Sequence, residues 1–251
     1  MPAPLLYCGD TNLEGPASYL AGLLTHFGWE FQYLPSDVSI SREILDRPYS
    51  LIVLSDYPAA RFDVDLQRIA LRQVANGTGL LMIGGWESFH GLGGNWDGTP
   101  LGLALPVEIG TGDDRVNFPQ PTLLKKIGQA DHPTIAGLPW DQPPTVGGLN
   151  RVRAKSTSTV VLEAVPFQVI QENQAFTFQP QPSFPALVVG QHGEGRTAAF
   201  LSDIAPHWVG GLVDWGASRV TAQAVGAPAI EVGSDYAKFW QQLLAWTGQM
   251  V

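Results

Sequence analysis

The chain has 251 residues, 45% of them hydrophobic and 15% charged, so it is long and apolar enough to bury the core of a globular protein. Its net charge of −9 disfavours binding to nucleic acid or to an anionic membrane surface, and no apolar run reaches the length of a membrane span. The single cysteine, Cys8, excludes an intrachain disulfide, and the N-terminal residues lack the pattern of a signal peptide, so we expect a cytoplasmic protein.

Strand and helix signals alternate through the first half of the chain. Short apolar runs predict strands, and amphipathic segments, two of them followed by a glycine, predict the helices between them. The predicted strands are 4–10, 30–35, 49–58 and 78–85, and the predicted helices are 15–28, 41–47 and 63–77. This alternation is typical of a Rossmann-like or flavodoxin-like α/β fold, in which helices cover both faces of a mostly parallel sheet.

The second half of the chain is richer in β-strand signals. Segments 159–165 and 167–171 read as strands, residues 186–201 form a predicted β-hairpin, and 235–248 has the apolar spacing of a C-terminal helix. No repeat or low-complexity linker separates the two halves. We therefore expect a single domain over residues 1–251, with a β-rich insertion at about 106–185 that extends the sheet.

Polar residues gather where the predicted strands end. In open sheets of this kind, ligands bind beyond the carboxyl ends of the strands. The sequence therefore predicts a small-molecule site at this edge, whose ligand it does not identify. The predicted ligand-binding residues are Asp10, Asp56, Gly84, Gly85, Trp86, Glu87, His90 and Trp208.

The stretch 80–94, LLMIGGWESFHGLGG, places an apolar strand before a glycine turn, as enzymes with a nucleophile at a strand end do. A serine elbow needs small residues two positions either side of the nucleophile, and Trp86 and His90 flank Ser88 there. Ser88 therefore fits a structural role better than a catalytic one. The amides of Gly84 and Gly85 could face an anion or an oxyanion.

The segment 198–211 ends another predicted strand with Ser202 and Asp203, and His207 and Trp208 follow. If this strand joins the sheet, His207 could act as a general base that Asp203 orients. Either Ser88 or an activated water would then be the nucleophile of a hydrolase. A hydrogen-bonded histidine that fixes a loop is an equally good interpretation.

The remaining signals for chemistry are weak. Cys8 lies in a predicted buried strand, where packing is a commoner role than nucleophilic attack. The five histidines are scattered without a metal-binding spacing, and the glycines of 91–98 do not follow the dinucleotide-loop order, so we expect no metal and no cofactor. The tryptophans late in the chain and the apolar loop 209–217 favour a homo-oligomer, which could also be a non-catalytic assembly: Trp208, Trp215, Trp240 and Trp246.

Several segments together resemble a known family. Residues 5–24, 80–109, 131–140 and 195–208 are similar to the putative glutamine amidotransferase family, within the class I glutamine amidotransferase-like superfamily. The resemblance implies a flavodoxin-like domain with a cysteine at the turn after a central strand and a His-x-Glu pair after a later strand. In this chain the turn reads Gly84-Gly85-Trp86, and Trp208 and Val209 follow His207. We therefore expect an amidotransferase-like protein without ordinary glutaminase activity, because a thioester mechanism requires a thiolate.

Overall fold

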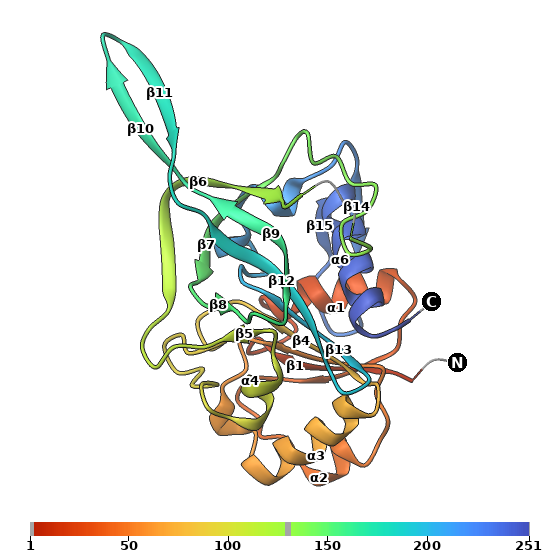
Figure 1. Ribbon diagram of the computed structural model, residues 1–251. Coiled ribbons are helices and arrows are strands. Elements are labelled where there is room, and N and C mark those ends of the chain that lie inside the picture. The colour runs from red at the N-terminus through yellow and green to blue at the C-terminus, as the bar shows by residue number, and fades with distance from the viewer. Residues whose placement is uncertain (1–2, 129–131, 251) are drawn as a thin grey trace.

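The computed structural model describes residues 3–128 and 132–250, and its main feature is a nine-stranded sheet in the order β2-β1-β3-β4-β13-β12-β9-β6-β7 (Figure 1). Residues 129–131, which belong to the predicted insertion, lie outside the described residues. Half of this sheet is parallel. The parallel strands are β1 (Leu5–Gly9), β2 (Phe31–Leu34), β3 (Leu51–Ser55), β4 (Gly79–Ile83) and β13 (Gly195–Phe200).

The strands of the other half are antiparallel, so the expectation of a mostly parallel sheet is not confirmed and the sheet is mixed. These strands are β12 (Phe184–His192), β9 (Thr159–Val165), β6 (Arg115–Lys126) and β7 (Thr145–Asn150). A short hairpin joins β12 to β13, and a longer hairpin joins β9 to β12. Direct connections of this kind impose antiparallel pairing. The sequence did not predict β6 or β7.

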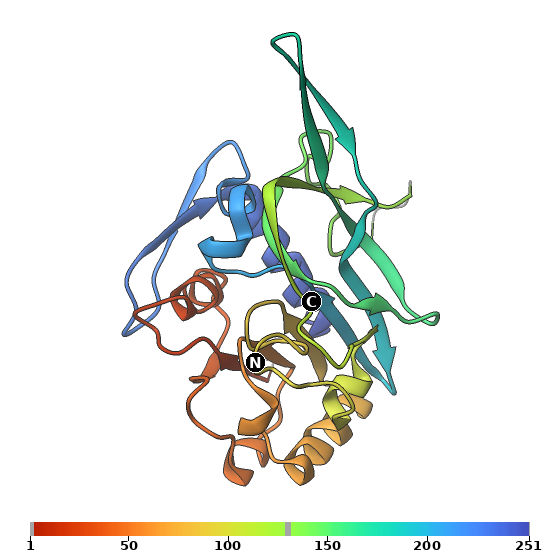
Figure 2. The same ribbon diagram turned by 90° about the vertical axis from the view of Figure 1, so that its left-hand side faces the viewer.

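Helices lie on both faces of the parallel half, as predicted (Figures 1 and 2). One face carries α1 (Ala17–His26) and α6 (Ser234–Thr247), and the other carries α2 (Arg42–Leu45), α3 (Val64–Ala75) and α4 (Pro100–Ala104). In α6, Phe239 and Trp240 are fully buried and their rings contact Phe200 of β13. None of the described helices combines the length and apolarity that crossing a membrane requires.

Short elements complete the fold. The helical turns are η1 (Ala59–Arg61), α5 (Pro206–Val209) and η2 (Gly210–Asp214). Three two-stranded sheets pair β5 (Val107–Glu108) with β8 (Arg153–Ala154), β10 (Phe167–Glu172) with β11 (Ala175–Pro180), and β14 (Arg219–Ala222) with β15 (Ile230–Gly233). The predicted hairpin at 186–201 is confirmed as β12–β13.

Three of the four tryptophans late in the chain belong to the core, which corrects the expectation that they form an interface, whereas Trp246 is only partly buried, with the Arg196 guanidinium over its ring. Trp240 is fully buried, and Trp208 and Trp215 are only 2% and 8% exposed. Trp215 packs against Trp140, and its indole N–H donates to the carbonyl of Gln142, so the loop 209–217 is held against the connection that precedes β7. These side chains therefore stabilise the fold and offer little surface to a partner.

Candidate functional site

The carboxyl ends of four adjacent parallel strands meet at one edge of the sheet. Gly9 of β1 pairs with Ser55 of β3, Ser55 with Ile83 of β4, and Ile83 with Phe200 of β13. The residues that follow these strands therefore emerge side by side. The order β2-β1-β3-β4 reverses direction between β1 and β3, and such a switch point is where α/β sheets hold ligands.

Two aspartates occupy the switch point. Asp10 follows β1 and Asp56 follows β3, with backbone φ angles of 41° and 45°. This left-handed region is strained for most residues, although Asp tolerates it better than others. Strained residues are found preferentially at functional sites. Trp86 lies in the turn after β4, but its φ angle is not positive, so this backbone strain is confined to the two aspartates among these three residues.

Asp10, Asp56 and Asp203 form a cluster of acids, of which Asp10 and Asp203 are buried and Asp56 is partly exposed. Asp10 and Asp203 are 4% and 1% exposed. Burial, followed by the charge of Asp203, raises the pKa of Asp10 to about 7, and burial followed by the charge of Asp10 does the same for Asp56. The pKa of Asp203 is raised well above its usual range by burial and by Asp56. With their pKa values raised by burial and by one another, the three carboxyl groups are not all charged near neutral pH, and at least one of them is protonated.

Three tyrosine hydroxyls donate hydrogen bonds within or beside the acid cluster. The Tyr7 hydroxyl donates to Asp10 Oδ2 at 2.6 Å, and the Tyr33 hydroxyl donates to the Asp10 carbonyl. The Tyr236 hydroxyl of α6 donates to the carbonyl of Ile204, beside Asp203. Burial raises the pKa of Tyr7 and Tyr236, so both stay protonated as hydrogen-bond donors. Sequence reasoning missed these tyrosines, because Tyr7 and Tyr33 precede the ends of β1 and β2, and Tyr236 lies in the first turn of α6.

The carboxylate of Asp56 fills the turn after β4. The amide of Glu87 donates to Asp56 Oδ1 at 2.7 Å, and the amide of Asp56 donates to Ser88 Oγ at 3.0 Å. A Cβ atom added to Gly85 would lie 2.1 Å from Asp56 Oδ1, and one added to Gly84 would lie 2.3 Å from the Leu201 carbonyl oxygen. The turn therefore has no room for a side chain at either glycine while these neighbours keep their places.

A buried Asp–Asn pair holds this turn from the antiparallel half of the sheet. Asn150 at the end of β7 accepts from the Gly85 amide and donates to the Gly85 carbonyl, at 2.9 and 3.1 Å. Asp114 accepts from the amides of His90 and Gly91 and from Asn150 Nδ2. The Gly84 amide donates to the Phe200 carbonyl. Both glycine amides are thus occupied inside the protein, which corrects the expectation that they face an anion.

His207 stands beside the acid cluster on α5. Its Nδ1 lies 3.1 Å from Asp203 Oδ2, and its side chain is 49% exposed. Burial lowers the pKa of His207 and raises that of Asp203. Both shifts disfavour the charged pair, so His207 is neutral near pH 7 and can accept a proton.

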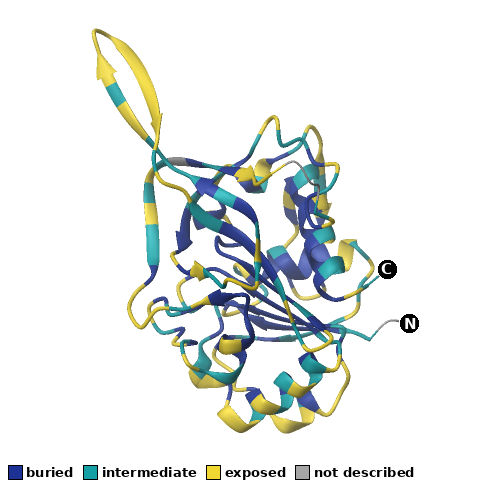
Figure 3. Cartoon of the chain, in the orientation of Figure 1, coloured by how far each residue is buried: buried dark blue, intermediate teal, exposed yellow. Residues whose placement is uncertain are grey.

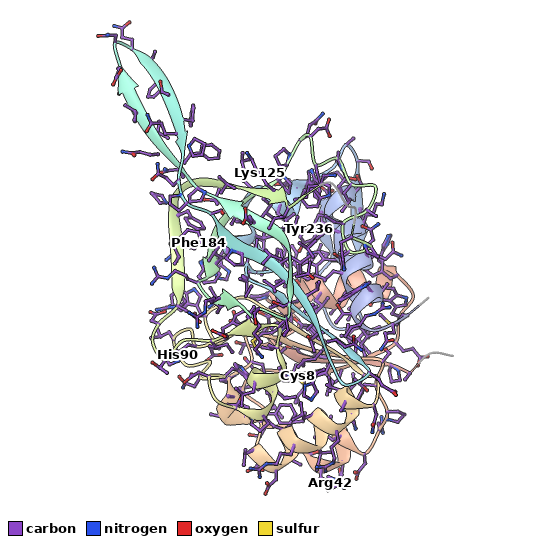
Figure 4. All side chains as sticks on the ribbon, viewed as in Figure 1. Cys8, Arg42, His90, Lys125, Phe184 and Tyr236 are labelled. Carbon is purple, nitrogen blue, oxygen red and sulfur yellow. The ribbon has the colours of Figure 1, made fainter. Side chains whose placement is uncertain are left out.

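The other predicted residues have different partners. Ser88 is buried and bonds to the Asp56 amide, with no contact to His207 among the described hydrogen bonds. His90 pairs with Asp97 at 2.7 Å, and Figure 4 labels it among the loops at the edge of the sheet. The Trp86 ring is 48% exposed and lies under the Arg115 guanidinium.

Trp208 and Cys8 are both buried. The buried Trp208 indole donates to Asn117 of β6 and packs on Gly148 of β7. Cys8 is fully buried in β1, and burial raises the pKa of its thiol, which keeps it protonated. Within residues 3–128 and 132–250, no three His, Cys, Asp or Glu side chains are grouped so as to hold a metal ion.

Comparison with known proteins places the chain in a family. The family described as putative glutamine amidotransferase matches residues 49–248, which is most of the chain. The chain belongs to this family. No curated protein sequence matches this glutamine amidotransferase-like chain significantly.

Solved structures share the fold of this family member over its full length. The cytoplasmic protein STM3548 from Salmonella typhimurium is 24% identical with a TM-score of 0.71, over 97% of this chain and 98% of that one. The cytoplasmic protein STM1381 from Salmonella typhimurium LT2 is 25% identical with a TM-score of 0.74, over 97% and 99%. A ThuA-like protein from Parabacteroides merdae ATCC 43184 is 14% identical with a TM-score of 0.60, over 99% and 90%.

Proposed function

We propose that this chain is a cytoplasmic, amidotransferase-like protein that binds a small molecule at the carboxyl edge of its sheet and does not hydrolyse glutamine. The observation that carries the proposal is the convergence of Asp10, Asp56 and Asp203 at a strand-order switch point, with no Lys or Arg ion pair to any of them among the described residues. The convergence agrees with the rule that ligands bind at such points in α/β sheets.

The acid cluster favours one class of ligand. Carboxylates accept hydrogen bonds and attract positive charge, and burial strengthens both effects because water screens them less. Asp56 and the half-exposed His207 lie at the accessible side of the cluster. The ligand should therefore carry an ammonium group, a guanidinium group or several hydroxyls, rather than a carboxylate or a phosphate.

The turn geometry supports the loss of glutaminase chemistry. A thiolate must attack the amide carbon of glutamine. The Asp56 carboxylate occupies the space that a side chain on Gly85 would need, and the Cys8 thiol is buried and protonated. We therefore expect no ammonia release from glutamine.

A ligand panel tests the proposal. Thermal unfolding is measured with glutamine, glutamate, arginine, spermidine and glucose, alongside an ammonia-release assay with glutamine. A cationic or hydroxyl-rich compound at about 100 times its Kd should stabilise the protein by about 2.7 kcal/mol, which raises Tm by roughly 5–10 °C. Asp56→Asn should abolish that shift, and the matched exposed change Asp46→Asn, just after α2, should keep it.

Three results would contradict the proposal. They are a panel in which neither the cations nor glucose raises Tm, a ligand shift that survives in Asp56→Asn, and ammonia release from glutamine. Ammonia release would show that glutamine hydrolysis persists at the Cys8 thiol or at a hydroxyl.

The pairing of His207 with buried Asp203 favours a second candidate, a hydrolase that activates water. Ser88 is a poor nucleophile here because its buried Oγ already accepts from Asp56. With p-nitrophenyl acetate as the probe, hydrolysis should rise to a plateau with an apparent pKa below 6.5, since burial lowers the pKa of His207. His207→Ala should remove this activity, while the exposed His26→Ala should not. Equal rates in both variants would eliminate the candidate.

A further inference from the structure

The β10–β11 hairpin, here called the arm (residues 167–180), projects away from the rest of the protein (Figures 1 and 2). Its base continues strands β9 and β12, which pair within the large sheet at Ala164 and Phe184. Beyond the hydrogen bond from the Gln181 amide to the Pro166 carbonyl, the two strands of the arm form a sheet of their own. A two-stranded ribbon is only marginally stable in water unless something covers one of its faces.

One face of the arm is apolar. The register pairs Val169 with Phe178 and Gln171 with Phe176, and alternation along the strands adds Phe167 to the same face. Val169, Phe176 and Phe178 are 41%, 61% and 62% exposed, and the arm is coloured mostly as exposed in Figure 3. The opposite face is mainly polar, with Gln168, Ile170, Thr177 and Gln179. Contiguous apolar side chains on an otherwise polar surface mark an interaction site.

The net charge of the arm and of the rest of the chain indicates which partner the arm can bind. The arm holds one charged residue, Glu172, next to its tip, so the rest of the chain carries −9 minus −1, or −8. Two such acidic bodies repel one another at close range. Each arm is about 20 Å long, which exceeds the Debye length of about 8 Å at physiological salt, so contact through the arms keeps the bodies apart. A basic partner would instead be drawn to the acidic body.

From this we infer that the apolar face of the arm packs against the same face of a second copy of this chain, in a symmetric dimer. An isologous contact of this kind needs a self-complementary surface, and an uncharged row of phenylalanines satisfies that need. The paired faces would bury on the order of 500 Å² per partner, somewhat less than the roughly 800 Å² of a standard interface. The dimer should therefore dissociate in the micromolar range and depend on concentration.

Sedimentation velocity from about 1 to about 200 µM tests this dimer. The unmodified chain should shift from monomer to dimer across this range. Phe176→Thr with Phe178→Thr should remain monomeric throughout, with at least a tenfold weaker association. Thr keeps a high strand propensity, so the ribbon is retained. Ile170→Thr is the matched control, because it makes a similar change on the opposite face and should leave the dimer intact.

Salt and cross-linking supply independent readouts. Dimerisation through an apolar face should persist or strengthen in sodium sulfate, whereas a charge-driven contact would weaken. Because Cys8 is fully buried, Gln171→Cys introduces an accessible thiol on the apolar face while keeping its phenylalanines, and oxidation should link two chains. A monomer at every concentration, or a dimer that survives the double phenylalanine substitution, would overturn the inference. So would equal loss of the dimer in Ile170→Thr.

Discussion

At the scale of single residues, the Asp56 carboxylate excludes a side chain at position 85, where the turn has a glycine. A Cβ atom on Gly85 would overlap the Asp56 carboxylate, so the turn can hold either a nucleophile at that glycine or this carboxylate in its present place. Asp56 also accepts from Glu87 and donates its own amide to Ser88. Asp56 thereby ties β3 to the turn after β4. Its surroundings raise its pKa, so its carboxyl group holds a proton more tightly than a free aspartate does.

The raised pKa of Asp56 predicts how stability depends on pH. The folded-state pKa of about 7 exceeds the unfolded value of about 3.9, so the folded state binds the proton more tightly. The stabilising contribution is complete below about pH 4 and is lost as pH rises through 7. Asp56→Asn removes the charge and keeps an acceptor. It should gain stability relative to the unmodified chain between pH 5 and 8, by on the order of 1 kcal/mol, or about 2–4 °C in Tm.

Thermal unfolding at several pH values measures this difference. Asp46→Asn is the control, since that exposed side chain pairs with Arg42 on α2 and should give a curve parallel to the unmodified chain. A difference between Asp56→Asn and the unmodified chain that stays constant from pH 5 to 8 would show that Asp56 titrates normally.

At the scale of elements, the turn after β4 depends on strands from the other half of the chain. Asp114 precedes β6 and Asn150 ends β7, yet together they bind the amides of Gly85, His90 and Gly91. Asp114 is 5% exposed and Asn150 is fully buried. The antiparallel half of the sheet therefore positions the candidate site as well as extending the fold.

Loss of the Asp114 carboxylate should destabilise the protein strongly. Asp114→Ala leaves three donors without their acceptor, and each unpaired buried donor costs about 1–3 kcal/mol. We expect a loss of about 3 kcal/mol or more in the free energy of unfolding, measured by urea denaturation. The neighbouring Asp113→Ala removes a pair with Arg115 and a hydrogen bond from the Arg115 amide, but its half-exposed carboxylate leaves these donors within reach of water, so it should cost about 1 kcal/mol. Equal effects of the two substitutions would refute the role of Asp114.

At the scale of the whole molecule, one sheet joins the two halves of the chain. Strand β13, from the late part of the chain, pairs with β4 and brings Asp203 and His207 to the edge formed by β1 and β3. We propose on this basis that residues 1–251 form a single domain. The arm projects from this domain. The sequence predicted an oligomer from the late tryptophans, most of which are buried, and we propose instead that the oligomer forms through the exposed phenylalanines of the arm.

The sequence by itself determined the parallel half of the sheet and its ligand edge. Apolar runs of strand length, separated by amphipathic helices, predict parallel strands, and polar residues such as Asp10 and Asp56 after those runs must emerge together. The signal is local in each case, because a strand and the residue that follows it are adjacent in the chain. The same reasoning placed Asp203 at this edge, on the condition that its strand joined the sheet.

Only the tertiary structure decided which side chains meet. The partners of Gly85 lie 29 positions away at Asp56 and 65 positions away at Asn150, and no local pattern encodes such distances. Tyr7 lies inside an apolar strand, so its hydrogen bond to Asp10 could not be predicted. Strands β6 and β7 lack clear alternation, so the hydrogen bonds by which Asp114 and Asn150 hold the turn after β4 could not be predicted either. The pKa values of the acids likewise follow from burial and proximity, which exist only once the chain has folded.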